Sequence, residues 1–243
     1  MVHVARHVRE HRSVLAAAEK RLLVAAARRM PQSITSDHLT LLALASMIGA
    51  GAAFAAIQQT PWSAAAVIVA LFFNWFGDSL DGTVARVRGW QRPRYGFYVD
   101  HVVDLAGTSC LLAGMGCSGR MSPVVAAALL AAYLLVAAES YLATHAAGIF
   151  RISFAGFGPT ELRIVLAVGA VFMAAQPERI VIPGLPPMWL FDAGGLVAIV
   201  ALAAAFVVSA VRNCRDLYAA EPLPRTRRAT RVHIDAAEPA SHT

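Results

Sequence analysis

Residues 61–104 read PWSAAAVIVALFFNWFGDSLDGTVARVRGWQRPRYGFYVDHVVD, and this stretch changes character halfway along. Its first part, near residues 61–84, is mostly apolar. It is about as long as a helix that crosses the ~30 Å hydrocarbon core of a bilayer, which takes roughly 20 residues. Aspartates and arginines follow at the end of the apolar run. The stretch therefore predicts a membrane helix with acidic groups at one end.

The composition of the whole chain agrees with a membrane protein. Of the 243 residues, 58% are hydrophobic and 15% are charged, whereas soluble domains carry about 25% charged residues. The composition argues against an ordinary soluble globule and excludes a disordered chain, collagen and a coiled coil. The net charge is +6 and 20 of the 21 basic residues are arginine, which favours anionic lipid or phosphate over nucleic acid as a partner. The three cysteines form no CxxC motif and predict small core residues instead of a disulfide or zinc site.

Six apolar segments are each about long enough to span a bilayer. They are expected near 38–58, 61–84, 97–117, 122–148, 159–176 and 187–211. Before them, Val4, Val8, Leu15 and Leu22 recur at helical spacing among basic residues. This spacing predicts an amphipathic helix on the membrane surface, with a soluble helix packed on the body as the alternative.

The predicted fold class is therefore all-α and integral to the membrane, with six transmembrane helices preceded by an amphipathic surface helix. Three parts are expected: a juxtamembrane helix at 1–30, a six-helix catalytic domain at 31–213, and a polar, disordered cytoplasmic tail at 214–243. Asp37 is the expected N-cap of the first span, and Pro61, Pro123 and Pro159 mark helix starts.

Arginine placement predicts the orientation in the membrane. Nineteen of the 21 basic residues lie before the first span, after the last, or in the second–third and fourth–fifth connections. Cytoplasmic loops carry such an excess of basic residues, so both termini are expected in the cytoplasm. The dominance of arginine and the abundance of alanine are typical of a GC-rich bacterial genome, which predicts the bacterial plasma (inner) membrane.

Four aspartates lie at the cytoplasmic ends of the second and third predicted spans. Asp78 and Asp81 are three residues apart, and Asp100 and Asp104 four apart, so each pair shares a helix face. The connection at 87–95 contains glycine and proline, which turn the chain and make the two helices antiparallel. Converging carboxylates repel unless a cation lies among them. Oxygen ligands without cysteine favour two hard divalent ions about 3.5–4 Å apart, which would clamp a pyrophosphate.

Small residues accompany these acids. Gly82 and Ala85 lie one turn from the first pair, and Gly96 one turn before the second, so a flat ligand can approach the backbone there. Alternative explanations are a proton or cation path, ion pairs between the acids and nearby arginines, and small residues that serve helix packing. The complete constellation favours a metal site that takes a pyrophosphate and a flat ligand.

At these residues the sequence resembles the CDP-alcohol phosphotransferase family of integral membrane enzymes. The pattern of that family is D-x2-D-G-x2-A-R-x8,9-G-x3-D-x3-D. All eight fixed positions match within 27 residues, and they are Asp78, Asp81, Gly82, Ala85, Arg86, Gly96, Asp100 and Asp104.

The resemblance implies a homodimer of six-span chains that transfers a substituted phosphate from a CDP-alcohol to a second alcohol and releases CMP. It implies that two Mg²⁺ or Mn²⁺ ions are held by Asp78, Asp81, Asp100 and Asp104. Asp104 would also be the catalytic base that takes the proton from the attacking hydroxyl. The residues implied in nucleotide binding are Gly82, Ala85, Arg86 and Gly96.

The acceptor alcohol is less well specified. Leu105 follows the last motif aspartate, where relatives that make phosphatidylglycerophosphate commonly have Lys nearby and relatives that make inositol lipids often have Arg. His101 resembles the D-H-x2-D of choline and ethanolamine phosphotransferases, although a lipid-interface role is equally compatible with it. Polar residues expected near the fourth and fifth spans are candidates for acceptor binding: Glu139, Arg151, Thr160, Glu161 and Arg163. Arginine binds phosphate well, but Glu161 and Arg163 can also satisfy each other.

We therefore expect an enzyme of phospholipid synthesis that uses CDP-diacylglycerol and a small polar alcohol, with membrane and lipid partners and no nucleic acid. The alternative within the class is transfer from CDP-choline or CDP-ethanolamine to diacylglycerol. A cation or proton transporter that uses the acids, and an inactive scaffold, are alternatives from other classes.

Overall fold

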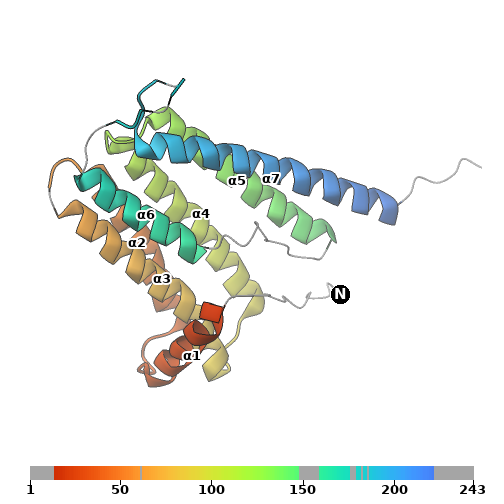
Figure 1. The fold of residues 1–243 in the computed structure, drawn as a ribbon. Helices are drawn as coiled ribbons and strands as arrows, with labels where there is room; N and C mark the ends of the chain where they lie inside the picture. Colours follow the sequence, from red (N-terminus) through yellow and green to blue (C-terminus); the bar gives the residue numbers. More distant parts are fainter. Residues whose placement is uncertain are drawn as a thin grey trace, which may run out of the picture.

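The computed structural model describes residues 14–60, 62–147, 159–175, 179–181, 183–184 and 186–221, without the side chains of 14–20, 147, 159 and 161. Seven helices follow one another: α1 (Val14–Arg29), α2 (Ser36–Ala55), α3 (Ser63–Arg88), α4 (Pro93–Cys117), α5 (Pro123–Ala147), α6 (Pro159–Ala175) and α7 (Leu190–Ala220) (Figure 1). No β-strand occurs in these ranges, only an isolated antiparallel bridge between Ile180 and Met188. The all-helical class is confirmed.

The ends of the helices follow local chemistry. Helices α5 and α6 begin at Pro123 and Pro159, since proline at the first helical position lacks an N–H that would have no partner there. Helix α3 ends at Gly89, whose φ of 68° is left-handed and suits glycine. Helix α7 continues to Ala220, seven residues past the boundary expected at 213/214.

The start of α2 differs from its prediction. The N-cap is Thr35, and its backbone N–H donates to Nδ1 of His38 at 3.1 Å. Asp37, expected as the N-cap, instead lies in the first helical turn. A carboxylate there still interacts favourably with the positive end of the helix dipole.

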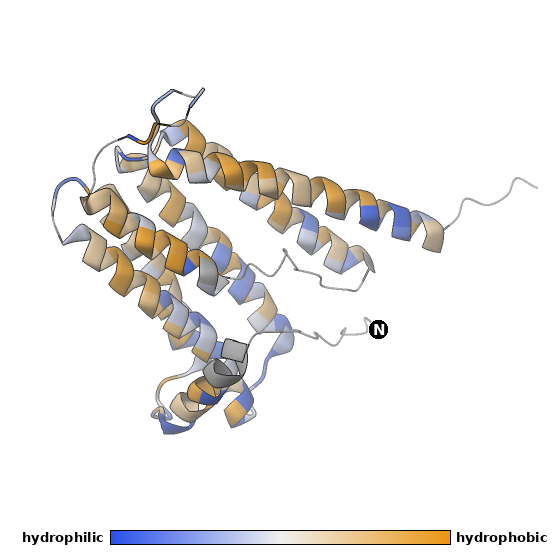
Figure 2. Ribbon diagram, viewed as in Figure 1, coloured by the Kyte–Doolittle hydropathy of each residue, from blue (hydrophilic) through white to orange (hydrophobic). Residues whose placement is uncertain are grey.

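Within the described residues, four helices, α2, α3, α5 and α7, are long and apolar enough to cross a bilayer, and α6 has a shorter apolar part at 162–175. Apolar residues run along α2, α6 and α7, whereas hydrophilic ones gather near α1 and at the end of α7 (Figure 2). Many large apolar side chains face outward, among them Leu41, Phe72, Val168 and Val200, as expected for contact with lipid. The chain is therefore an integral membrane protein. The full count of six spans and the amphipathic character of 1–30 remain predictions.

Helix α2 is the centre of the packing. It contacts both α3 and α4, whereas α3 and α4 hardly touch each other. A Cβ atom added to Gly114 of α4 would lie 2.0 Å from the carbonyl oxygen of Gly51 in α2. The absence of side chains at these two glycines therefore lets the backbones of α2 and α4 meet.

A second packing unit joins α5 and α7, which lie side by side (Figure 1). Ser122, just before α5, donates its backbone N–H to Oδ1 of Asp192 in the first turn of α7, at 2.7 Å. Phe191 of α7 meets Phe54 of α2 edge to face, with ring centroids 5.6 Å apart. These contacts join the pair to the rest of the bundle at the end opposite α1.

Helix α1 packs on the last turns of α3. Ala27 of α1 shares an apolar cluster with Leu39 of α2 and with Leu80 and Val84 of α3. Arg88 donates to the carbonyl oxygens of Met30, Pro31 and Ile34, at 2.6–2.9 Å. The connection from α1 to α2 is thus bound to α3 at the end of the bundle that carries the acids.

Candidate active site

The four motif aspartates lie on two helices that run in opposite directions. Asp78 and Asp81 are on α3, and Asp100 and Asp104 are on α4. Electrostatic repulsion acts from Asp78 and Asp100 on Asp81, and from Asp78, Asp81 and Asp100 on Asp104. The four carboxylates therefore lie within electrostatic range of one another, and their convergence on one metal site stays a prediction.

Arg163 of α6 contacts the first of these acids. Its Nη2 donates to Oδ2 of Asp78 at 2.7 Å, and its Nε donates to Oδ1 of Asn74 at 2.7 Å. The side chains of Arg163 and Asp78 are 17% and 30% exposed. This ion pair is therefore better shielded from water than a surface pair, which contributes little.

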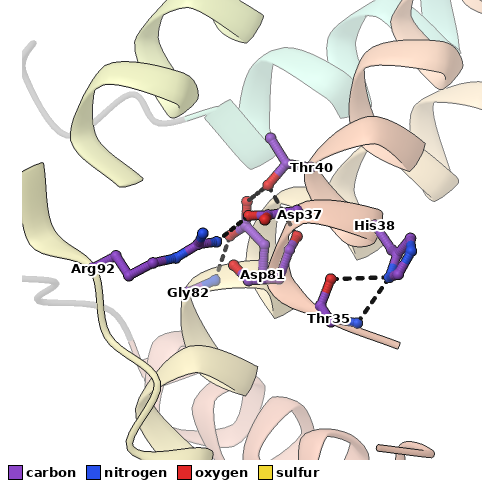
Figure 3. Close-up of polar contacts among 8 residues, drawn as sticks. Thr35, Asp37, His38, Thr40, Asp81, Gly82 and Arg92 are labelled. Carbon is purple, nitrogen blue, oxygen red and sulfur yellow. Dashed lines mark hydrogen bonds and ion pairs between the residues drawn. The ribbon is translucent and has the colours of Figure 1, made fainter. Parts of the chain in front are cut away.

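Asp81 is held by α2 and by its own helix. The hydroxyl of Thr40 donates to Oδ2 of Asp81 at 2.8 Å, and the backbone N–H of Gly82 donates to Oδ1 (Figure 3). Thr40 is buried, with 8% of its surface exposed. Both carboxylate oxygens of Asp81 therefore accept a hydrogen bond, and its orientation is fixed.

The acids of α4 lie in a different environment. The side chain of Asp104 is exposed and that of Asp100 is half-buried. Arg163 also exerts an opposite-charge attraction on Asp104. Asp104 thus experiences repulsion from the other three carboxylates and attraction from Arg163.

The four aspartates are suitable ligands for hard divalent cations. Their candidate ligand atoms are carboxylate oxygens, and no sulfur is present among them. Within the described side chains, however, no three Asp, Glu, His or Cys residues are close enough to hold one ion together. The candidate metal ligands are present. However, Oδ2 of Asp78 accepts a hydrogen bond from Arg163, and Oδ2 of Asp81 accepts one from Thr40.

The predicted nucleotide residues have unequal surroundings. A Cβ on Gly82 would lie 3.3 Å from Nη1 of Arg86, so this glycine leaves room for the Arg86 side chain. Nη2 of Arg86 donates to the hydroxyl of Thr83 at 3.1 Å. Gly96 is exposed in the first turn of α4, and a Cβ there would meet nothing within 4 Å.

Ala85 borders a cavity of about 400 Å³. The cavity is lined by Thr35, Ser36, Asp37, Val84, Ala85, Trp90, Gln91 and Arg92. Arg92 reaches from the α3–α4 connection to form an ion pair with Asp37 of α2 (Figure 3). This hydrogen bond raises the pKa of the Arg92 guanidinium. The cavity thus has small or polar groups on one side and an arginine on the other.

The residues predicted to bind the acceptor alcohol have different surroundings in the structure. Arg163 reaches the acids, as described above. Oε1 and Oε2 of Glu139 accept hydrogen bonds from Asn213 at 2.7 Å and Ser209 at 2.8 Å, both in α7. His101 lies against Phe97 and Tyr141, with ring centroids 4.1 and 5.0 Å away.

Three further candidates lie at or beyond the start of α6. Thr160 is exposed in its first turn. Arg151 lies outside the described residues, and so does the side chain of Glu161. Arg163 pairs with Asp78, while a pair of Arg163 with Glu161 involves a side chain outside the described residues and stays a prediction.

Sequence reasoning missed Thr40 and Asn74. Both are buried polar residues inside apolar helices, and this was the available signal, because a buried polar group in a membrane helix needs a partner. Asn74 lies one turn before Asp78 and donates to the carbonyl oxygen of Ala43 at 3.1 Å. Its partners on α2 and α6 could not be named from the sequence.

The described residues thus form an integral membrane protein whose motif aspartates lie at the end of α3 and the start of α4. The sequence profile of the CDP-alcohol phosphatidyltransferase family matches residues 33–211. The chain therefore belongs to this family, and it is a transferase of phospholipid synthesis that uses a CDP-alcohol.

A solved structure shares the fold. It is the phosphatidylinositol phosphate synthase of Mycobacterium tuberculosis with CDP-DAG bound, 20% identical, with a TM-score of 0.54. The similarity covers 82% of this chain and 94% of that one. No curated protein sequence matches the chain significantly.

Proposed function

We propose that the protein transfers a phosphatidyl group from CDP-diacylglycerol to a small polar alcohol and releases CMP. The observation that carries this proposal is the grouping of four motif carboxylates from two antiparallel helices beside one arginine. A donor with a pyrophosphate needs positive charge at its phosphates, and an alcohol acceptor needs a base. This grouping supplies ligands for the first and a carboxylate for the second.

Asp78, Asp81, Asp100 and Asp104 would hold two Mg²⁺ or Mn²⁺ ions. When bound, such ions neutralise the charge that develops on the departing phosphate. Thr40 and the Gly82 N–H orient Asp81, so that carboxylate needs little rearrangement to act as a ligand. Gly82, Ala85, Arg86 and Gly96 are proposed for the nucleotide, with the cavity beside Ala85 as its supporting feature.

Asp104 is proposed as the base. Its exposed carboxylate accepts the proton of the acceptor hydroxyl while the hydroxyl oxygen forms a bond to the β-phosphorus. The bond from that phosphorus to the bridging oxygen breaks in line, and CMP leaves with the electron pair. A base positioned in this way contributes about 10²–10⁴-fold to the rate.

The proposed setting is a homodimer in a bacterial plasma membrane with both termini in the cytoplasm. The lipid donor would enter sideways between helices and the polar acceptor from the cytoplasm. Arg163 is the acceptor candidate with the strongest support, because its Nη2 donates to Oδ2 of Asp78. His101, Glu139, Arg151, Thr160 and Glu161 remain candidates with weaker support.

The test is CMP release by protein purified in lipid with Mg²⁺ or Mn²⁺. One arm gives CDP-diacylglycerol with glycerol 3-phosphate, serine, inositol, inositol phosphate or choline. A parallel arm gives CDP-choline or CDP-ethanolamine with diacylglycerol. Release that depends on one acceptor in the first arm supports the proposal and names the product. Release only in the second arm contradicts it, and silence in both arms without nucleotide binding favours a transporter or scaffold.

A further inference from the structure

Arg163 joins three helices at the acid site. From α6, its guanidinium donates to Asn74 and to Asp78, which are four residues apart on α3. Residues at this spacing are neighbours on one helix face. The guanidinium therefore lies along α3, with separate N–H groups engaged at two successive turns.

Asn74 is itself held in place. Its side-chain amide donates to the carbonyl oxygen of Ala43 in α2, which leaves its Oδ1 directed to Nε of Arg163. Asn74 is 7% exposed, so water competes weakly for this contact. A buried amide thus orients the arginine toward Asp78 before any ligand arrives.

We propose that Arg163 is an internal counter-ion that competes with the divalent cation for Asp78. The inference deepens the proposed function and rests on the proposed metal site. Four neighbouring carboxylates repel one another, and one guanidinium relieves part of that repulsion. Oδ2 of Asp78 accepts a hydrogen bond from Nη2 of Arg163 at 2.7 Å, so a cation that binds this oxygen meets the positive guanidinium beside it and competes with that N–H.

Displacement need not remove the arginine from the site. The Nε–Asn74 hydrogen bond does not involve Asp78, so it can hold the guanidinium nearby after Nη2 is released. Arg163 is therefore a positioning residue with two states. In one state it neutralises Asp78, and in the other its free N–H groups face the acids, where a phosphate of the substrate would lie.

The experiment measures Mn²⁺ binding without nucleotide or lipid substrate. Free Mn²⁺ is followed by electron paramagnetic resonance during titration of purified full-length protein in nanodiscs. Wild type is compared with Arg163→Gln and Asn74→Leu. Arg179→Gln is the control, because Arg179 stacks on Trp189 and lies away from the acids. Asp81→Asn identifies binding at the acid site.

Arg163→Gln is expected to tighten Mn²⁺ binding about tenfold, the factor that loss of one competing charge-assisted hydrogen bond represents. Asn74→Leu keeps the charge and loses the orienting contact, so a tightening of roughly threefold is expected. It also keeps the test decisive if Arg163→Gln fails to fold. Arg179→Gln should match wild type.

Two outcomes overturn the inference in different ways. Unchanged or weaker Mn²⁺ binding in both variants, with binding still lost in Asp81→Asn, means that Arg163 supports the metal site or ignores it. The proposed function then stands without the competition. Absence of Mn²⁺ binding in every protein overturns the inference together with the proposed metal site.

Discussion

The two halves of the acid site are built differently. On α3, Asp78 and Asp81 are each hydrogen-bonded to a neighbouring helix, through Arg163 of α6 and Thr40 of α2. On α4, the side chain of Asp104 is exposed. The contrast indicates that α3 supplies carboxylates held by hydrogen bonds from other helices, whereas α4 carries the aspartate proposed as the base.

Metal removal acts on both halves at once. We expect EDTA to abolish transfer, because the proposed divalent ions would neutralise the charge on the departing phosphate. Restoration by added Mg²⁺ or Mn²⁺ in the CMP-release assay is the control for irreversible damage. Full activity in excess EDTA would remove the two-metal mechanism.

Asp104→Asn tests the α4 half alone. An amide cannot take the hydroxyl proton, so transfer should fall by about 10²–10⁴-fold while cytidine nucleotide binding is largely retained. CMP release and nucleotide binding by calorimetry measure the two effects. Asp216→Asn, an exposed change near the end of α7, is the matched control. Wild-type turnover of Asp104→Asn would show that another group is the base.

Gly77→Ala tests the α3 half through its packing. A Cβ at Gly77 would lie 2.5 Å from the carbonyl oxygen of Leu39 in α2, so α3 must move away from α2 and carry Asp78 and Asp81 with it. Transfer should fall by up to about 100-fold, the order of effect that a 1 Å misplacement causes.

The control for this change is Gly49→Ala on α2, where an added Cβ meets nothing within 4 Å. It should leave transfer at the wild-type rate. If both variants lose activity equally, the close approach at Gly77 is not what positions the acids. If neither variant loses activity, transfer depends little on the orientation of the two carboxylates on α3.

Glu139→Gln has the smallest expected effect and lies outside both halves. It weakens the acceptor for Ser209 and Asn213, so the free energy of unfolding should fall by about 1 kcal/mol with transfer unchanged. Thermal unfolding in detergent and the KM for the acceptor measure the two. A raised KM for the acceptor with unchanged stability would instead support Glu139 as an acceptor-binding residue.

Much of the fold could be predicted because membrane helices are specified locally. Apolar length and prolines placed the helices, and α5 and α6 begin at the expected residues, Pro123 and Pro159. The sequence predicts too early an end for α7, because a helix can continue through polar residues beyond the apolar segment that indicates the span. The N-cap of α2 was assigned to Asp37, but the reciprocal contact of Thr35 with His38 places it two residues earlier.

The acids could be predicted because their spacing is a local property of two helices. Their partners could not, because the contact of Arg163 with Asp78 joins residues 85 positions apart and depends on how α6 packs on α3. Glu139 illustrates the reverse case. It is a polar residue in an apolar helix, and the sequence could not show that its carboxylate binds to α7.

The three carbonyl groups bound by Arg88 fasten the α1–α2 connection to the last turn of α3. Arg88 lies two helical turns after Asp81, on the same rigid helix. A displacement of residues 30–34 along the helix axis is therefore passed to the acids without an intervening hinge. Arg88 thus ties the segment that precedes α2 to the helix that carries Asp78 and Asp81.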